Sequence, residues 1–212
     1  MKNIMLDLET FGTNPFSMII SIGAVYFDPT KQGPEAIKSQ FYVTIDPIAS
    51  AKAGFLTDMS TICWWLDPQR NAIYKDWMGD AHFEPADALN GFSQWLAMLF
   101  DVTADFNALD DVDLTDSPAT LQTAEHIAMW GNGPAFDNEI LRNAYHRMSM
   151  PVPWKHFGDR CFRTMKNLPG AKLLAPPHEG PQHNALVDAR QQALWLCNIH
   201  TRFGGFIPVT NG

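Results

Sequence analysis

The pattern of apolar residues predicts three strands near the start of the chain. Residues 2–8 form a short apolar run that ends in acidic residues, and 18–27 is rich in apolar and β-branched residues. Residues 40–46 have the same strand character. Because no helical segment separates these runs, we expect an antiparallel meander.

Beyond these strands the apolar residues recur mainly at helical spacing. One further apolar run, 126–131, predicts a buried strand. Pro68 would interrupt a helix, so the segment 60–77 is one helix or two short ones. The predicted helices are 60–77, 85–100, 136–148, 158–168 and 184–203.

Two segments are predicted to be irregular. Residues 101–118 are acidic and read as an exposed loop or insertion, while 171–183 contain too much Pro and Gly for regular structure. The predicted order of elements, without internal repeat or linker, favours one mixed-sheet α/β domain over residues 1–212, with helices on both faces.

Composition adds few constraints. The chain has 46% hydrophobic and 18% charged residues, as in ordinary globular proteins, and no apolar stretch long enough to predict a membrane span. Cys63, Cys161 and Cys197 lack zinc-site spacing, which favours reduced thiols in a cytoplasmic protein.

The charge is uneven along the chain. The net charge is −8, yet the interval from Arg142 to Lys172 holds seven basic residues and one acid, Asp159. Two interpretations stay open. The acidic and basic segments are either solvated faces of the protein, or the basic segment forms a short surface beside a carboxylate site that suits a few nucleotides of a single strand.

Four carboxylates and one histidine are the candidate catalytic residues. Asp7 and Glu9 are two apart on a predicted strand, so both lie on one face of the sheet. Asp137 begins a predicted helix, His183 ends the Pro- and Gly-rich loop, and Asp188 falls in the first turns of the last helix. Taken singly, each also suits a solvent-facing strand end, a helix first turn or the surface.

Taken together, the five residues favour metal-dependent phosphodiester hydrolysis. Carboxylate ligands without Cys indicate Mg²⁺ or Mn²⁺, and two such ions can clamp the attacking and leaving oxygens at phosphorus. A neutral His on a loop suits a general base that takes the proton of the attacking water.

The motifs around these residues resemble those of the DEDD superfamily of 3′–5′ exonucleases, His subclass, which includes the proofreading subunit of bacterial DNA polymerase III. DLET, NGPAFD and HNALVDA are similar to its three exonuclease motifs. STICWWLDPQ and DRCFRTMK resemble a subgroup with phage exonuclease A, exonuclease VIII-like phage proteins and the polyadenylate-tail exoribonuclease of mycobacteria. The resemblance implies a ribonuclease H-like fold.

The resemblance also implies a role for each motif residue. Asp7 would bridge two Mg²⁺ or Mn²⁺ ions, Glu9 and Asp188 would complete the site of the ion on the nucleophile side, and Asp137 would hold the ion at the leaving group. His183 would deprotonate the attacking water.

Further residues are candidates for contact with the substrate. Asn132 stands five residues before Asp137, one more than in the proofreading subunit, so its role stays open. Trp64 and Trp65 are both considered, and the alternative is that at least one of them belongs to the core. For Arg160 and Arg163 the alternative is a surface role. The candidates are Phe11, Gly12, Trp65, Asn132, Arg160 and Arg163.

The sequence therefore predicts a 3′–5′ exonuclease that acts on single-stranded 3′ ends and releases nucleoside 5′-monophosphates. DNA is the first choice of substrate, because the subgroup includes phage DNA exonucleases, and RNA is the alternative. Two other classes stay open: an inactive nucleic-acid-binding protein on the same fold and a phosphoesterase of free nucleotides. Related families include homodimers, so a homodimer is one expectation.

Overall fold

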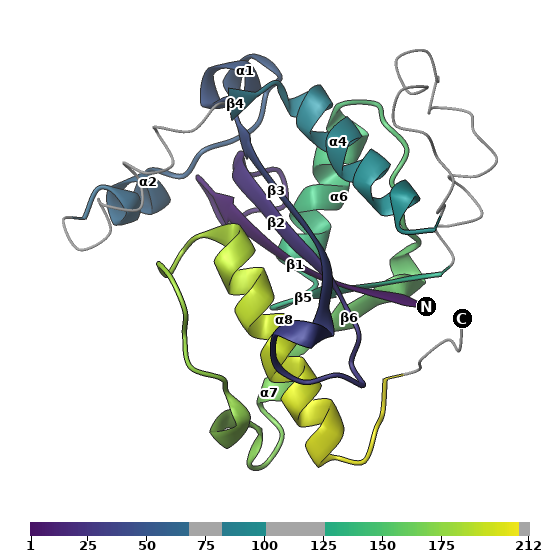
Figure 1. Ribbon diagram of the computed structural model, residues 1–212. Helices are drawn as coiled ribbons and strands as arrows, with labels where there is room; N and C mark the ends of the chain where they lie inside the picture. The colour runs from purple at the N-terminus through teal and green to yellow at the C-terminus, as the bar shows by residue number, and fades with distance from the viewer. Residues whose placement is uncertain (68–81, 101–125, 208–212) are drawn as a thin grey trace.

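The computed structural model describes residues 1–67, 82–100 and 126–207, and a mixed β-sheet forms its centre (Figure 1). Within these residues the sheet has six strands in the order β4-β3-β2-β1-β5-β6. Neighbours among β1, β2 and β3 are antiparallel, whereas β5 is parallel to β1 and β6 is parallel to β5. The strands are β1 (Lys2–Thr10), β2 (Ile19–Phe27), β3 (Ile37–Ile45), β4 (His82–Phe83), β5 (Ile127–Gly131) and β6 (Asp159–Cys161).

Helices cover both faces of this sheet, as predicted (Figure 1). In the described residues, no helix combines the length and the apolar character that a membrane span requires. The α-helices are α1 (Pro47–Lys52), α2 (Met59–Trp65), α4 (Pro85–Met98), α6 (Asp137–Arg147), α7 (Phe162–Lys166) and α8 (Ala185–Arg202). Short 3₁₀ helices are η1 (Gly33–Ala36), η3 (His156–Gly158) and η4 (Ala171–Leu174).

The predicted meander is confirmed by β1, β2 and β3, and the predicted strand at 126–131 by β5. The helices predicted at 85–100, 136–148 and 184–203 are confirmed by α4, α6 and α8. β1 continues two residues past its predicted end because Glu9 and Thr10 still pair with β2. As a result, Glu9 is a strand residue, like Asp7.

One predicted helix was wrong at its start. Residues 158–168 were expected to be helical throughout, but Asp159–Cys161 form β6, and α7 begins only at Phe162. The side chain of Asp159 explains the strand, because it accepts hydrogen bonds from Asn138, Arg142 and Trp154 and so holds the segment beside β5.

Other differences concern short elements. The sequence did not predict α1, which begins with a proline and is capped by the side chain of Asp46, nor the two-residue strand β4. The predicted loop 171–183 contains the 3₁₀ turn η4. Of the predicted helix at 60–77, the structure shows α2, while its later part and the acidic segment 101–118 lie outside the described residues.

Alternate residues of β1 belong to two separate cores. Ile4, Leu6 and Leu8 pack with residues of α4 and α6 on one face of the sheet. Met5 packs on the opposite face with residues of β2, α7 and α8. Successive strand residues point to opposite faces, so the acids at positions 7 and 9 lie on the face that α8 covers.

Gly23 lets the first turn of α8 lie directly on the sheet. It pairs with Asp7 on β1. A Cβ added at Gly23 would lie 2.1 Å from the carbonyl carbon of Ala185 and 2.2 Å from the backbone nitrogen of Leu186. The start of α8 therefore lies at the level of Asp7, an approach that a side chain at position 23 would prevent.

Gly23→Ala should push α8 away from β2 and lower the free energy of unfolding by about 1–3 kcal/mol, the usual effect of overpacking. Urea denaturation measures the change. The control is Gly91→Ala on α4, where a Cβ would lie 3.8 Å from the ring of Phe41 and where the higher helix propensity of alanine should leave stability equal or slightly raised. A Gly23→Ala protein as stable as the unaltered chain would contradict the close approach.

Candidate active site

Asp7 and Glu9 project from the end of β1 that lies under the start of α8. Asp7 is opposite Gly23 and Glu9 is opposite Ser21 in the pairing with β2. The Asp7 carboxylate accepts a hydrogen bond of 2.7 Å from the Nε2 of Gln192, on the inner face of α8. Both acids are half-buried, so neither is a fully solvated surface acid.

Asp137 is the first residue of α6, and its carboxylate accepts hydrogen bonds from the backbone of β1 and of the residue that follows β5. Its side chain is buried, with 3% of its surface exposed. One carboxylate oxygen accepts from the backbone N–H of Leu8 at 3.3 Å, and the other from that of Asn132 at 3.1 Å. Gly131 leaves room for this turn, since a Cβ there would lie 2.4 Å from the Oδ1 of Asn138.

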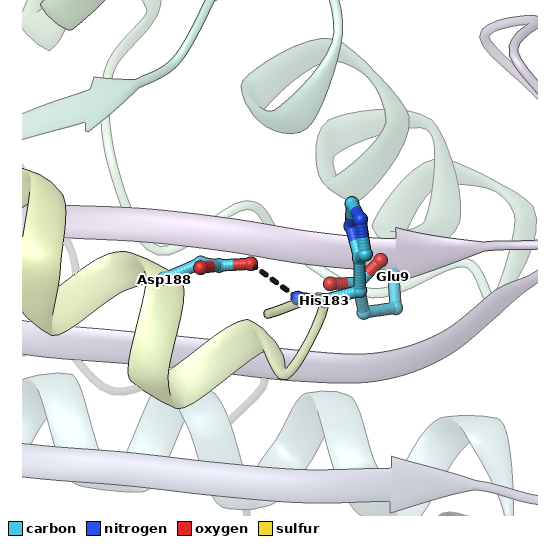
Figure 2. Close-up of side chains that lie close together, drawn as sticks. All are labelled: Glu9, His183 and Asp188. Atoms are coloured by element: carbon cyan, nitrogen blue, oxygen red, sulfur yellow. Dashed lines mark hydrogen bonds between the residues drawn. The ribbon is translucent and has the colours of Figure 1, made fainter. Parts of the chain in front are cut away.

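His183 and Asp188 come from the loop before α8 and from its first turn. The backbone N–H of His183 donates to Asp188 Oδ2 at 2.9 Å, the dashed contact in Figure 2. His183 has a φ of 62°, in the left-handed region, and the next residue, Asn184, caps α8 by accepting from the backbone of Leu186 and Val187. The tight turn therefore ties the histidine to the acid on the helix.

Glu9, His183 and Asp188 form a group that can hold a metal ion. One ligand atom from each residue lies within 4.8 Å of the other two (Figure 2). Within the described residues, no Lys or Arg forms an ion pair with these two acids, Asp7 or Asp137. Oxygen-rich ligands without a fixed cation suit Mg²⁺ or Mn²⁺, so the residues present fit a divalent metal site.

The environment of three carboxyl groups favours their neutral form when no metal is bound. Burial, followed by the charges of Asp137, Glu9 and Asp188, raises the pKa of Asp7 well above its ordinary value. Burial and then the charges of Asp188 and Asp137 raise the pKa of Glu9 to about 8. Burial raises the pKa of Asp137 to about 7, although its backbone donors and Arg163 act in the opposite direction.

A pocket of about 340 Å³ opens beside Glu9. Trp64 forms part of its wall and also meets the ring of His183 edge-on, with the ring centroids 4.8 Å apart. Hydroxyl groups and aromatic rings share the lining, which suits a group with a flat apolar face and polar edges. The lining residues are Leu8, Glu9, Thr10, Thr13, Ser60, Thr61, Trp64, Trp65 and Phe136.

The candidates nearest this pocket occupy different positions. Trp65 lines the pocket, yet it is 3% exposed and donates its Nε1–H to the carbonyl of Thr10, so it also belongs to the core. Phe11 is not among the residues that line the pocket and packs against Ile20 and Trp65. Gly12 faces Ser17, whose Oγ would be 2.6 Å from an added Cβ.

The polar candidates also differ in their placement. Arg163 lies against Gly133, where an added Cβ would be 3.2 Å from its guanidinium carbon, and its charge acts on Asp137. Arg160 instead donates to the carbonyls of Phe157 and Asp159 in its own segment. The backbone of Asn132 binds Asp137, while its side-chain Oδ1 is buried without a hydrogen-bond partner in the described part of the chain.

Sequence reasoning missed two residues that contact the carboxylates. Gln192 binds Asp7, and the Nε2 of His178 lies 3.4 Å from Asp188 Oδ1. The spacing of four between Asp188 and Gln192 places both on one face of a helix and was a usable signal. No comparable signal marked His178, because the loop that contains it has no periodicity.

Comparisons with known proteins found a matching family model and solved structures similar to this chain. The family model described as Rv2179c-like, 3′–5′ exoribonuclease Rv2179c-like domain, matches residues 2–200. No curated protein sequence matches the chain. Among solved structures, the nuclease domain of 3′hExo, a DEDDh family member bound to rAMP, is 14% identical, with a TM-score of 0.57, over 95% of this chain and 92% of that chain.

Two further solved structures have lower TM-scores. Cell-death related nuclease 4 is 15% identical with a TM-score of 0.47, over 96% of this chain and 64% of that chain. The RNase domain of yeast Pop2 is 14% identical with a TM-score of 0.48, over 95% of this chain and 77% of that chain. The likeness to the 3′hExo domain confirms the ribonuclease H-like fold expected from the sequence.

The raised pKa values predict how stability depends on pH. In the metal-free protein, Glu9 and Asp137 bind protons more tightly when folded than when unfolded, so their contribution is complete at acid pH and is lost as the pH rises through about 8. The thermal midpoint of unfolding in EDTA should therefore decrease as the pH is raised from about 6 to about 8.5. Excess Mn²⁺ should raise this midpoint most at the higher pH.

Circular dichroism with and without Mn²⁺ measures these midpoints. Asp7→Asn is the matched variant, since it removes a carboxyl group whose own pKa is raised well above its ordinary value and should flatten the metal-free pH dependence. Equal metal-free midpoints at the two pH values would show that folding does not raise the pKa of these carboxyl groups as described.

Proposed function

We propose that this chain, which belongs to the Rv2179c-like family of 3′–5′ exoribonuclease domains, removes nucleotides one at a time from the 3′ end of single-stranded RNA. Each cycle would release a nucleoside 5′-monophosphate. The convergence of four carboxylates and His183 from β1, α6, α8 and the loop before α8 carries this proposal. Membership of the family makes the chain a 3′–5′ exonuclease rather than a phosphoesterase of free nucleotides, and the assembled site argues against an inactive binding protein.

The carboxylates would hold two Mg²⁺ or Mn²⁺ ions. Glu9 and Asp188 lie close enough to share one ion, Asp137 would bind the other, and Asp7 would contact both. When bound, such ions lower the pKa of a water molecule and neutralise charge at phosphorus. Asp7 and Glu9 are half-buried and have raised pKa values, so they would release their protons on binding a divalent ion and then supply the negative charge that it requires.

His183 would accept the proton of the attacking water. Its imidazole lies near the carboxylates of Glu9 and Asp188, and the edge of Trp64 supports the ring from the pocket side. A neutral imidazole can take a proton near neutral pH, whereas the neighbouring carboxylates are needed as ligands. Its left-handed backbone and its N–H bond to Asp188 keep the ring beside that acid.

The pocket beside Glu9 would receive the terminal nucleotide. Trp64, Trp65 and Phe136 offer surfaces for a base to stack on, and hydroxyl groups of Thr and Ser residues offer hydrogen bonds to a ribose. Arg163 would contact a phosphate near Asp137.

RNA becomes the first choice of substrate because the family is described as exoribonuclease. DNA, favoured from the sequence alone, is the second candidate. The subgroup that DRCFRTMK and STICWWLDPQ resemble includes phage DNA exonucleases as well as an exoribonuclease. The single-domain organisation, the cytoplasmic location and the homodimer stay predictions.

A side-by-side digestion tests the substrate. With 5′-labelled single-stranded RNA and DNA of one sequence and with Mn²⁺, we expect a ladder that shortens from the 3′ end and a rate on RNA about tenfold higher, equal to about 1.4 kcal/mol for lost 2′-hydroxyl contacts. A faster rate on DNA would favour the second candidate. If neither substrate is shortened while Mn²⁺ is bound, the proposal is wrong.

His183→Ala should lower turnover by about 10²–10⁴-fold and leave the affinity for Mn²⁺ nearly unchanged, because a general base acts on the proton and not on the metal. Single-turnover assays and calorimetric Mn²⁺ titration measure the two effects. His146→Ala, an exposed histidine on α6, is the control and should behave like the unaltered chain. Strongly weakened Mn²⁺ binding in His183→Ala would make this histidine a ligand instead.

A further inference from the structure

Gln192 is a polar residue within the apolar inner face of α8. Its exposed fraction is 8%, and the neighbouring buried residues of the helix are apolar, including Ala189, Ala193 and Leu196. Its Nε2 donates to the Oδ1 of Asp7 at 2.7 Å, across 185 positions of sequence. The contact links the helix that carries Asp188 to the strand that carries Asp7.

The hydrogen bonding of this amide is incomplete. Its Oε1 is buried and has no hydrogen-bond partner in the described residues. A buried polar atom without a partner costs about 1–3 kcal/mol, so an apolar side chain of similar size would fill this position with less penalty. The bond to Asp7 is therefore the contact that accounts for an amide here.

Two of the other carboxylates are contacted differently. Asp137 accepts from two backbone N–H groups. Asp188 accepts from the backbone of His183 and lies 3.4 Å from the Nε2 of His178. In the part of the chain that the structure describes, Asp7 accepts its side-chain hydrogen bond from Gln192. The orientation of the Asp7 carboxylate thus depends on one neutral amide.

We propose that Gln192 is a positioning residue that fixes the Asp7 carboxylate for metal binding. The inference rests on the proposed function, in which Asp7 contacts both metal ions. A neutral donor suits this place, because a Lys or Arg would compete with the metal for the carboxylate, and an acid would add to the repulsion within the cluster.

The position of Gln192 on α8 gives the helix two roles. Gln192 follows Asp188 by four residues, one turn of the helix, so both side chains point to the same side. α8 supplies one ligand directly and orients a second through the amide. A displacement of α8 would therefore disturb Asp188 and Asp7 together.

Gln192→Met tests the inference, because it keeps the length of the side chain and removes the donor. We expect the affinity for Mn²⁺, measured by calorimetry without nucleic acid, to fall about 10–100-fold, the usual effect of losing a partner of a metal ligand. The half-saturating Mn²⁺ concentration for RNA hydrolysis should rise by a similar factor, turnover should recover at saturating Mn²⁺, and KM for RNA should stay unchanged.

Asn198→Leu is the matched control. Asn198 is an amide on the same helix that donates to the carbonyl of Leu174 at 2.9 Å and contacts none of the carboxylates. Its substitution should lower the thermal midpoint slightly and leave Mn²⁺ affinity unchanged, which separates a lost helix contact from a lost ligand contact. If Gln192→Met does not fold, Gln192→Asn keeps an amide that is one methylene too short and should show the same weakening.

The outcomes are distinguishable. Weakened Mn²⁺ binding in the Gln192 variants with an unchanged control supports the positioning role. A folded Gln192→Met or Gln192→Asn protein that binds Mn²⁺ as tightly as the unaltered chain overturns it. If the unaltered chain itself binds no Mn²⁺, the metal site of the proposed function fails, and the positioning role fails with it.

Discussion

The repulsion among four carboxylates at the end of β1 is the constraint to which the surrounding structure responds. Burial raises the pKa of Asp7, Glu9 and Asp137, and the charges of neighbouring carboxylates raise those of Asp7 and Glu9 further. No Lys or Arg of the described residues forms an ion pair with any of the four acids. Such a cluster opposes folding unless protons or metal ions neutralise it. The rest of the fold must therefore supply enough packing to keep the acids together.

That packing comes from both faces of the central sheet. The face under α4 and α6 has the larger apolar core, while α8 lies so close to β2 that Gly23 has no space for a side chain. The Asp159 carboxylate accepts hydrogen bonds from the side chains of Asn138, Arg142 and Trp154, so that α6 is held to β6 next to Asp137. The site is thus formed by rigid elements, and His183 is the member that a loop contributes.

The sequence predicted the fold and the five motif residues because both leave periodic or motif-level signals. Apolar runs located β1, β2 and β5, and the spacing of Asp7 and Glu9 placed both on one face. The start of residues 158–168 could not be predicted, because β6 depends on contacts of Asp159 with residues distant in sequence. His178 was missed for a similar reason, since loop geometry alone brings it to Asp188.

The hydrogen bond from the Leu8 backbone to Asp137 means that one carboxylate of the proposed metal site also satisfies a backbone group of the sheet. β1 pairs with β5 only as far as Leu6 and Gly131, and Asp137 then accepts the N–H that lies just beyond. Removing this acid would leave a strand amide without its acceptor, so loss of catalysis and loss of folding are linked there. Substitution of His183, which belongs to a loop, removes no hydrogen-bond acceptor from the sheet, so it tests the proposed site with less effect on folding than substitution of Asp137.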